Sequence, residues 1–153
     1  MKLIILTCAA ALAALAADPA GFKIWKGTEL KGAGKKLSPK INAQKVATEQ
    51  LGTYGNHLIM MAHREGDGEA EVHDIQADVF IVQSGEATLV YGGQVVGGKT
   101  TAPNEVRGPS ISGGSKVKMG AGDIVHIPAK TAHQVLVESG KQFTYAMVKV
   151  DVK

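Results

Sequence analysis

Histidine is scarce in this 153-residue sequence, and its five copies are His57, His63, His73, His126 and His133. His73 follows Glu71 by two residues, and side chains two apart point to the same side of a strand. Asp78 begins the next apolar segment and can point back at this pair after a short bend. A distant histidine could complete the set. Because imidazole and carboxylate ligands suit iron, manganese, zinc, nickel or copper, the pattern indicates a divalent transition-metal site.

Simpler roles remain open for these residues. Glu71 lies within residues 65–78, which hold six acids, so it could belong to a solvated acidic loop. His63 and His126 fit packing, or the support of a ligand, better than ligation itself. His57 fits the surface. If the site had decayed, His73 and His133 would persist as ordinary polar residues.

The N-terminus has the pattern of a secretory signal peptide. Lys2 provides a positive start, residues 3–16 carry no charge, and Ala14-Leu15-Ala16 offers small residues for cleavage. This apolar stretch is shorter than the roughly 20 residues that a membrane span needs, so no stable membrane anchor is expected. Cleavage would remove Cys8, the only cysteine, and leave no disulfide. We therefore expect a periplasmic or secreted protein.

The elements that must position the site are mostly strands. A short helix is expected over residues 28–37, with Thr28 as its cap. Strands are expected at residues 57–63, 78–83, 86–91, 94–96, 116–119, 123–127, 133–138 and 142–150. Gly92-Gly93 is typical of a hairpin turn, and residues 97–115 are expected to form a long loop. Many short strands separated by glycine turns favour a barrel or sandwich.

Basic residues gather near the N-terminus. Residues 23–45 hold seven lysines and a single acid, Glu29. This segment could contact anionic surfaces, but a solvated face explains it more simply. Phe22 and Trp25 are too few aromatics to form a stacking surface, so no nucleic-acid partner is expected.

Two segments of the sequence resemble the paired motifs of the cupin superfamily. The second motif has a glycine, a proline six residues later, and a histidine five residues after that. The matching residues are Gly122, Pro128 and His133. The first motif has two histidines two apart, then a glutamate, then a glycine seven residues on. His73, Asp78 and Gly85 have this spacing, and the resemblance covers about residues 57–150.

The resemblance implies an all-β double-stranded β-helix, the cupin jelly-roll barrel, after a short N-terminal helical extension. It also implies a metal site formed by Glu71, His73, Asp78 and His133. The sequence departs from the motifs at Glu71, where the family has a histidine, at Asp78, where it has a glutamate, and at Lys130, where it often has glycine. Aspartate is the shorter acid, so we rank His133 and His73 first as ligands, Glu71 next and Asp78 last.

Two classes of function follow from such a barrel, whose cavity would take a small organic molecule. One is a metal-dependent enzyme of the dioxygenase, isomerase or decarboxylase type. The other is a non-catalytic module that binds a small ligand or a metal. An acid or base in the cavity that binds no metal would favour an enzyme, and His63, His126 and Tyr145 are the candidates. Whether the protein is an enzyme stays open here.

The chain is expected to divide into a signal peptide over residues 1–16, an N-terminal extension over 17–45 and a barrel over 46–153. Phe22, Ile24 and Trp25 are too apolar for a free tail. Together with the exposed edges of a small barrel, they indicate a homodimer.

Overall fold

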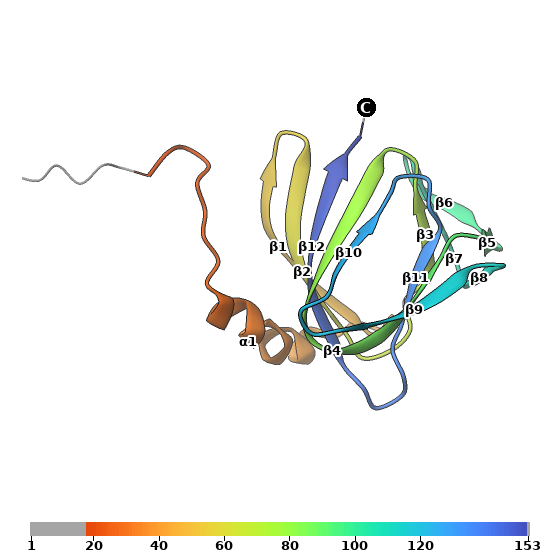
Figure 1. Ribbon diagram of the computed structural model, residues 1–153, viewed down its shortest axis with the longest axis horizontal. Coiled ribbons are helices and arrows are strands. Elements are labelled where there is room, and N and C mark those ends of the chain that lie inside the picture. Colours follow the sequence, from red (N-terminus) through yellow and green to blue (C-terminus); the bar gives the residue numbers. More distant parts are fainter. Residues whose placement is uncertain (1–17, 153) are drawn as a thin grey trace, which may run out of the picture.

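Two antiparallel sheets face each other and curl into a barrel in the computed structural model, which describes residues 18–152 (Figure 1). The helix is α1 (Gly27–Leu37), followed by a 3-10 turn at Ser38–Lys40. The strands are β1 (Val46–Tyr54), β2 (His57–Arg64), β3 (Ala70–His73), β4 (Gln76–Tyr91), β5 (Gln94–Val96), β6 (Lys99–Ala102), β7 (Glu105–Gly108), β8 (Ser110–Ser112), β9 (Ser115–Gly120), β10 (Ile124–Ile127), β11 (His133–Leu136) and β12 (Phe143–Asp151).

The long strand β4 joins the two sheets. Its first half pairs with β12 and β10, and its second half pairs with β9 and β11. The two strands expected at 78–83 and 86–91 are therefore one strand. It continues through Gly85, whose φ of +79° lies in the left-handed region that favours glycine. A Cβ at Gly85 would lie 1.9 Å from the carbonyl oxygen of Gln142, so only glycine fits where β4 meets β12.

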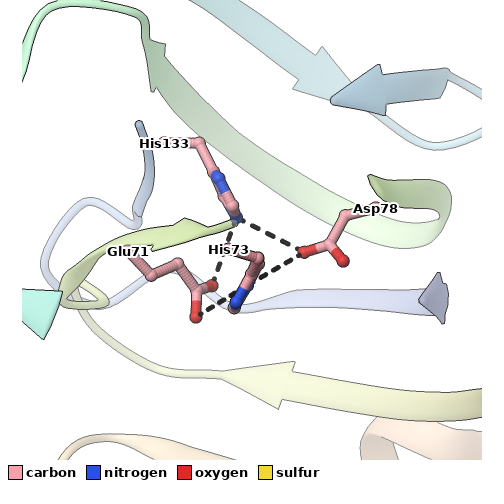
Figure 2. Close-up of side chains that lie close together, drawn as sticks. All are labelled: Glu71, His73, Asp78 and His133. Atoms are coloured by element: carbon pink, nitrogen blue, oxygen red, sulfur yellow. Dashed lines mark ion pairs between the residues drawn. The ribbon is translucent and has the colours of Figure 1, made fainter. Parts of the chain in front are cut away.

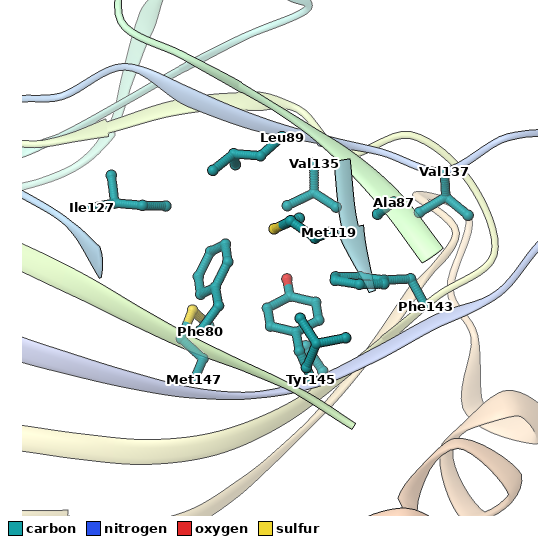
Figure 3. Packing of buried hydrophobic residues seen from close by; sticks show 12 residues of the cluster. Phe80, Ala87, Leu89, Met119, Ile127, Val135, Val137, Phe143, Tyr145 and Met147 are labelled. Atoms are coloured by element: carbon teal, nitrogen blue, oxygen red, sulfur yellow. The ribbon is translucent and has the colours of Figure 1, made fainter. Parts of the chain in front are cut away.

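The barrel interior is filled by apolar side chains from both sheets (Figure 3). Phe143, Tyr145 and Met147 share one face of β12, as the alternation predicted, and all three are buried. Phe80 packs on Tyr145, with their ring centroids 4.8 Å apart. The rest of this core comes from β2, β4, β9, β10, β11 and the residue after β11: Ala62, Val82, Ala87, Leu89, Met119, Ile127, Val135 and Val137.

Helix α1 packs on the outer face of the sheet that contains β1, β2 and β12. Ala33 and Leu37 are buried there against Met61 and Ala146. The predicted apolar face of the helix is thus confirmed, but the predicted cap is wrong. The helix begins at Gly27 after Lys26, whose backbone N–H donates to the Glu29 carboxylate at 3.3 Å.

The segment expected as a long loop, residues 97–115, instead contains three short strands. β6 and β7 form a hairpin, and β7 continues the sheet beside β3. The glycine turn at Gly92-Gly93 leads into β5 as expected, but β5 pairs with β8 and not with β4. The prediction of a long loop over residues 97–115 failed because this segment is polar. Its strands form through pairing with other parts of the chain, and no apolar alternation marks them in the sequence.

The expected signal peptide, residues 1–16, lies outside the described residues. No helix within residues 18–152 is long and apolar enough to cross a membrane.

Candidate metal centre

The structure brings the four predicted ligands together in one buried cluster (Figure 2). Glu71 and His73 lie two apart on β3 and point the same way, as the strand geometry predicted. His133 begins β11 directly opposite Glu71, and Asp78 lies near the start of β4. Three strands are therefore held in register by backbone pairing, and all four side chains are buried.

The separations between the four groups are short and even. Nε2 of His133 lies 3.4 Å from Oε1 of Glu71 and 3.4 Å from Oδ2 of Asp78. Nε2 of His73 lies 3.6 Å from Oε2 of Glu71 and 3.6 Å from the same Asp78 oxygen. Asp78, expected to reach least far, thus comes as close to both histidines as Glu71 does.

Both histidines are oriented through their second ring nitrogen. Nδ1 of His133 donates to the carbonyl oxygen of Thr131 at 3.0 Å. Nδ1 of His73 faces the Glu105 carboxylate at 3.3 Å. Such partners place a proton on Nδ1 and direct Nε2 into the site, as in metal-ligating histidines. The buried Nε2 of His133 has no hydrogen-bond partner of good geometry among the described residues.

The loop before His133 is tied to the same site. Lys130 adopts a φ of +64°, in the left-handed region, at the position where the cupin motif often has glycine. Its backbone N–H donates to the carbonyl oxygen of His73 at 2.7 Å. The departure noted in the sequence is therefore accommodated by an unusual backbone conformation, and this turn links the two histidine-bearing strands.

The sequence pattern did not indicate three further charged residues of the cluster, which are Glu105, Arg107 and Lys149. Arg107 on β7 contacts Glu71 at 2.5 Å and Glu105 at 2.6 Å. Lys149 on β12 donates from Nζ to both oxygens of Asp78, at 3.0 and 2.9 Å, and lies 2.9 Å from Nε2 of His73. The alternation of β12 could have revealed Lys149, which continues the face of Tyr145 and Met147.

These charges shift the pKa values of the site. Burial alone would raise the pKa of Glu71, but the positive charges of His133, Arg107 and Lys149 lower it to about 2. Burial is likewise outweighed at Asp78, whose pKa falls well below its usual range beside His133, His73 and Lys149. Burial would lower the pKa of His133, yet the two carboxylates raise it to about 9.

Without a bound metal, the two carboxylates that face Nε2 of His133 therefore favour the protonated ring. The charge of Arg107 is offset by Glu105, so this proton and the ammonium of Lys149 leave two positive charges to balance Glu71 and Asp78. A divalent ion that replaced both would leave the net charge unchanged. The electrostatics of the site thus favour a doubly charged cation.

The donor set also fits a transition metal by its geometry. The four ligand atoms lie within 4.8 Å of one another. Ligands about 2.0–2.2 Å from a tetrahedral ion are separated from each other by roughly 3.3–3.6 Å. The four histidine–carboxylate separations of 3.4–3.6 Å match this spacing, with the two histidines facing different oxygens of Glu71. Two imidazoles and two carboxylates form a borderline-to-hard set that does not select one metal.

The other residues singled out in the sequence lie away from these four. His63 is buried under α1, where Nδ1 contacts the Thr144 hydroxyl at 2.8 Å and Nε2 contacts Glu65 at 3.2 Å. His57 is half-buried and stacks on Tyr54. His126 is exposed on β10.

Tyr145 is packed within the barrel core. Its phenol oxygen accepts a hydrogen bond from Arg64 Nε at 3.2 Å, and burial raises the pKa of the phenol. Of the three acid–base candidates, His126 and His63 each line a hollow, and only His126 is itself exposed to solvent.

The hollow beside His126, of about 190 Å³, is lined by residues of β9 and β10, which both pair with β4, and by the turn after β10. Apolar side chains line most of it, with His126 and Thr131 among the polar exceptions. None of the four clustered side chains lines this hollow. It nevertheless adjoins the site, because the Thr131 carbonyl orients His133.

Comparisons with known proteins identify the fold. No protein-family model matches this sequence, and no curated protein matches it. Among solved structures, a Klebsiella pneumoniae protein with a double-stranded β-helix domain aligns at TM-score 0.57 and 17% identity, over 85% of this chain and 90% of that one. TT1209 from Thermus thermophilus aligns at TM-score 0.55 and 17% identity, over 78% and 94%.

A ligand-bound structure also shares the fold. A variant of Streptomyces PAC13 solved with uridine aligns at TM-score 0.52 and 10% identity, over 73% of this chain and 74% of that one. At these identities the likeness establishes the fold alone. The double-stranded β-helix expected from the sequence is confirmed.

Proposed function

Because the chain has the double-stranded β-helix fold of the cupins, we propose that it is a small-molecule-binding cupin with a divalent metal held by His73, His133, Glu71 and Asp78. One observation carries the metal proposal. The buried Nε2 of His133 has no partner of good geometry among the described residues, yet it faces two carboxylates at 3.4 Å. A buried polar atom of this kind calls for a bound group.

The histidines and the carboxylates would have different roles in binding the ion. His133 and His73 would each offer Nε2, while Thr131 and Glu105 hold the protons on Nδ1. Glu71 and Asp78 would offset the charge of the ion. An ion held there would supply Lewis-acid or redox chemistry to a molecule beside it.

We place the organic molecule in the hollow between β9 and β10. Its apolar lining and volume of about 190 Å³ suit a compact, weakly polar molecule. His126 at its rim is the side chain positioned to exchange a proton with such a molecule. The uridine bound by the PAC13 variant supports a small organic ligand in a barrel of this fold. Reactions of the dioxygenase, isomerase or decarboxylase type would all suit the arrangement.

A second candidate is a binding module without catalysis. It is favoured by the separation of the hollow from the clustered side chains, none of which lines it. A molecule in the hollow would then be bound without reaching the metal. Oxygen uptake, or product formation, with a panel of small phenols and acids separates this candidate from an enzyme.

We also propose that the protein is exported. Lys2, the uncharged residues 3–16 and Ala14-Leu15-Ala16 support a cleaved signal peptide. N-terminal sequencing of the native protein should return a start at Ala17 or Asp18. A sequence beginning at Met1 would contradict export by cleavage.

The metal proposal is tested on protein purified without added chelator. Elemental analysis should find close to one transition-metal ion per chain after reconstitution, and His133→Ala should abolish it. His126→Ala is the matched control, because this histidine lies outside the cluster and should leave metal content unchanged. If His133→Ala retained full metal content with native circular dichroism, the site would lie elsewhere.

A further inference from the structure

Lys149 occupies a position that the proposed metal site would need. It lies directly opposite Asp78 in the antiparallel pair of β12 and β4, with only 13% of its side chain exposed. Its Nζ donates to Asp78 at 2.9 and 3.0 Å and to Nε2 of His73 at 2.9 Å. The Lys149 ammonium thus already contacts two of the four proposed metal ligands, Asp78 and His73.

The lysine and a metal ion cannot use these donors together. The Glu105 carboxylate faces Nδ1 of His73, so the ring has one lone pair, on Nε2, for the site. That lone pair can accept from the ammonium or bind an ion, but not both. Two cations held by the same imidazole and carboxylate would also repel each other strongly in a buried setting.

We propose that Lys149 is a built-in competitor that must leave the cluster before a divalent metal binds, so that it weakens the metal affinity of the chain. This inference rests on the proposed metal site and adds its regulation. The lysine side chain is flexible and partly exposed, so it can withdraw toward solvent without rearranging a strand.

The test is a titration of the full chain with Co²⁺, whose visible spectrum reports its coordination. Lys149→Met removes the ammonium, and Lys149→Gln removes the charge while keeping an N–H donor for Asp78. Both should bind Co²⁺ at least tenfold more tightly than the native chain. Lys149→Arg keeps a cation beside Asp78 and should bind no more tightly than the native chain.

Two further measurements distinguish competition by Lys149 from a general effect of removing a lysine on Co²⁺ affinity. Lys116→Met removes an exposed lysine on β9 and should leave Co²⁺ affinity unchanged. Lys149→Met without metal should unfold at a lower temperature than the native chain, because Asp78 loses its partner, and Co²⁺ should restore much of the loss. Lys149→Gln serves the same purpose if Lys149→Met does not fold.

The outcomes distinguish this inference from the metal proposal. If Lys149→Met and Lys149→Gln bind Co²⁺ no more tightly than the native chain, and the native chain binds it, Lys149 is not a competitor and the metal site stands. If none of the three binds Co²⁺, both proposals fall. If only the two variants bind it, Lys149 is a competitor strong enough to keep the native chain metal-free, and the metal proposal for the native protein falls.

Discussion

His133 and Glu71 lie opposite each other in the pair of β11 and β3, and Nε2 of His133 is 3.4 Å from Oε1 of Glu71. A backbone pair therefore holds two of the proposed ligands at a fixed spacing. His133 also pairs with Tyr91 of β4, the strand that carries Asp78. The site is thus built on paired strands, which position side chains more precisely than loops do.

The first prediction concerns the order of the ligands. His133→Ala and His73→Ala should each remove the metal almost completely, because each imidazole offers a lone pair that no neighbour can replace. Asp78→Asn should weaken binding by roughly tenfold only, since an amide oxygen remains near the site. Metal content after dialysis measures the series. An Asp78→Asn protein that lost more metal than His133→Ala would reverse the proposed order.

The second prediction concerns Glu105, which lies 3.3 Å from Nδ1 of His73. Glu105→Gln should weaken metal binding by about 10–100-fold, because the carboxylate holds the His73 ring in the orientation that directs Nε2 into the site. Isothermal titration with Zn²⁺ measures the effect. Glu86→Gln on β4 is the control, since Glu86 is exposed and far from the histidines in register. Equal affinities for the two variants would contradict this role for Glu105.

Much of the site could be predicted from sequence, because its signals are local. The period of two along a strand placed Glu71 and His73 on one side, and the glycine, proline and histidine spacing located His133. The same alternation on β12 extends from Phe143 through Tyr145 and Met147 to Lys149. A lysine was not expected to point inward, because a buried ammonium is costly unless it is paired, and its partner Asp78 is remote in sequence.

Glu105 and Arg107 could not be predicted in the same way. They lie on β7, which has charged residues on the face toward the site and therefore no apolar alternation. The strand forms because it pairs with β3 and β6. Their role thus depends on tertiary contacts that the surrounding glycines, prolines and serines do not indicate.

The third prediction tests how β4 passes between the sheets. Gly85→Ala should lower the free energy of unfolding by about 3 kcal/mol or more, because the new methyl group would overlap the Gln142 carbonyl. Gly122→Ala is the matched control. Gly122 has a φ of +95°, but a methyl group there would meet no atom within 4 Å, so this variant should lose only about 1–2 kcal/mol from backbone strain. Urea unfolding measures both, and equal losses would show that close contact at Gly85 is unimportant.

The last prediction concerns the stability of the metal-free protein at alkaline pH. The folded pKa of His133 is raised to about 9 from an ordinary value of 6.5. A raised pKa stabilises the fold fully below about pH 6.5, and this contribution is lost as the pH rises through 9. The loss should be on the order of 1–3 kcal/mol. Urea unfolding from pH 6 to 10 in the presence of a chelator measures it.

Two variants isolate the contribution of His133 from that of other titrating groups. His133→Gln cannot gain the proton, so its stability should fall less between pH 6 and 10 than that of the native chain. His126→Gln removes an exposed histidine and should keep the native pH dependence. A native chain whose stability followed the same pH profile as His133→Gln would show that the two carboxylates do not hold a proton on His133. The sign of the effect follows from the site itself, because Glu71 and Asp78 lie 3.4 Å from Nε2 and favour the charged ring.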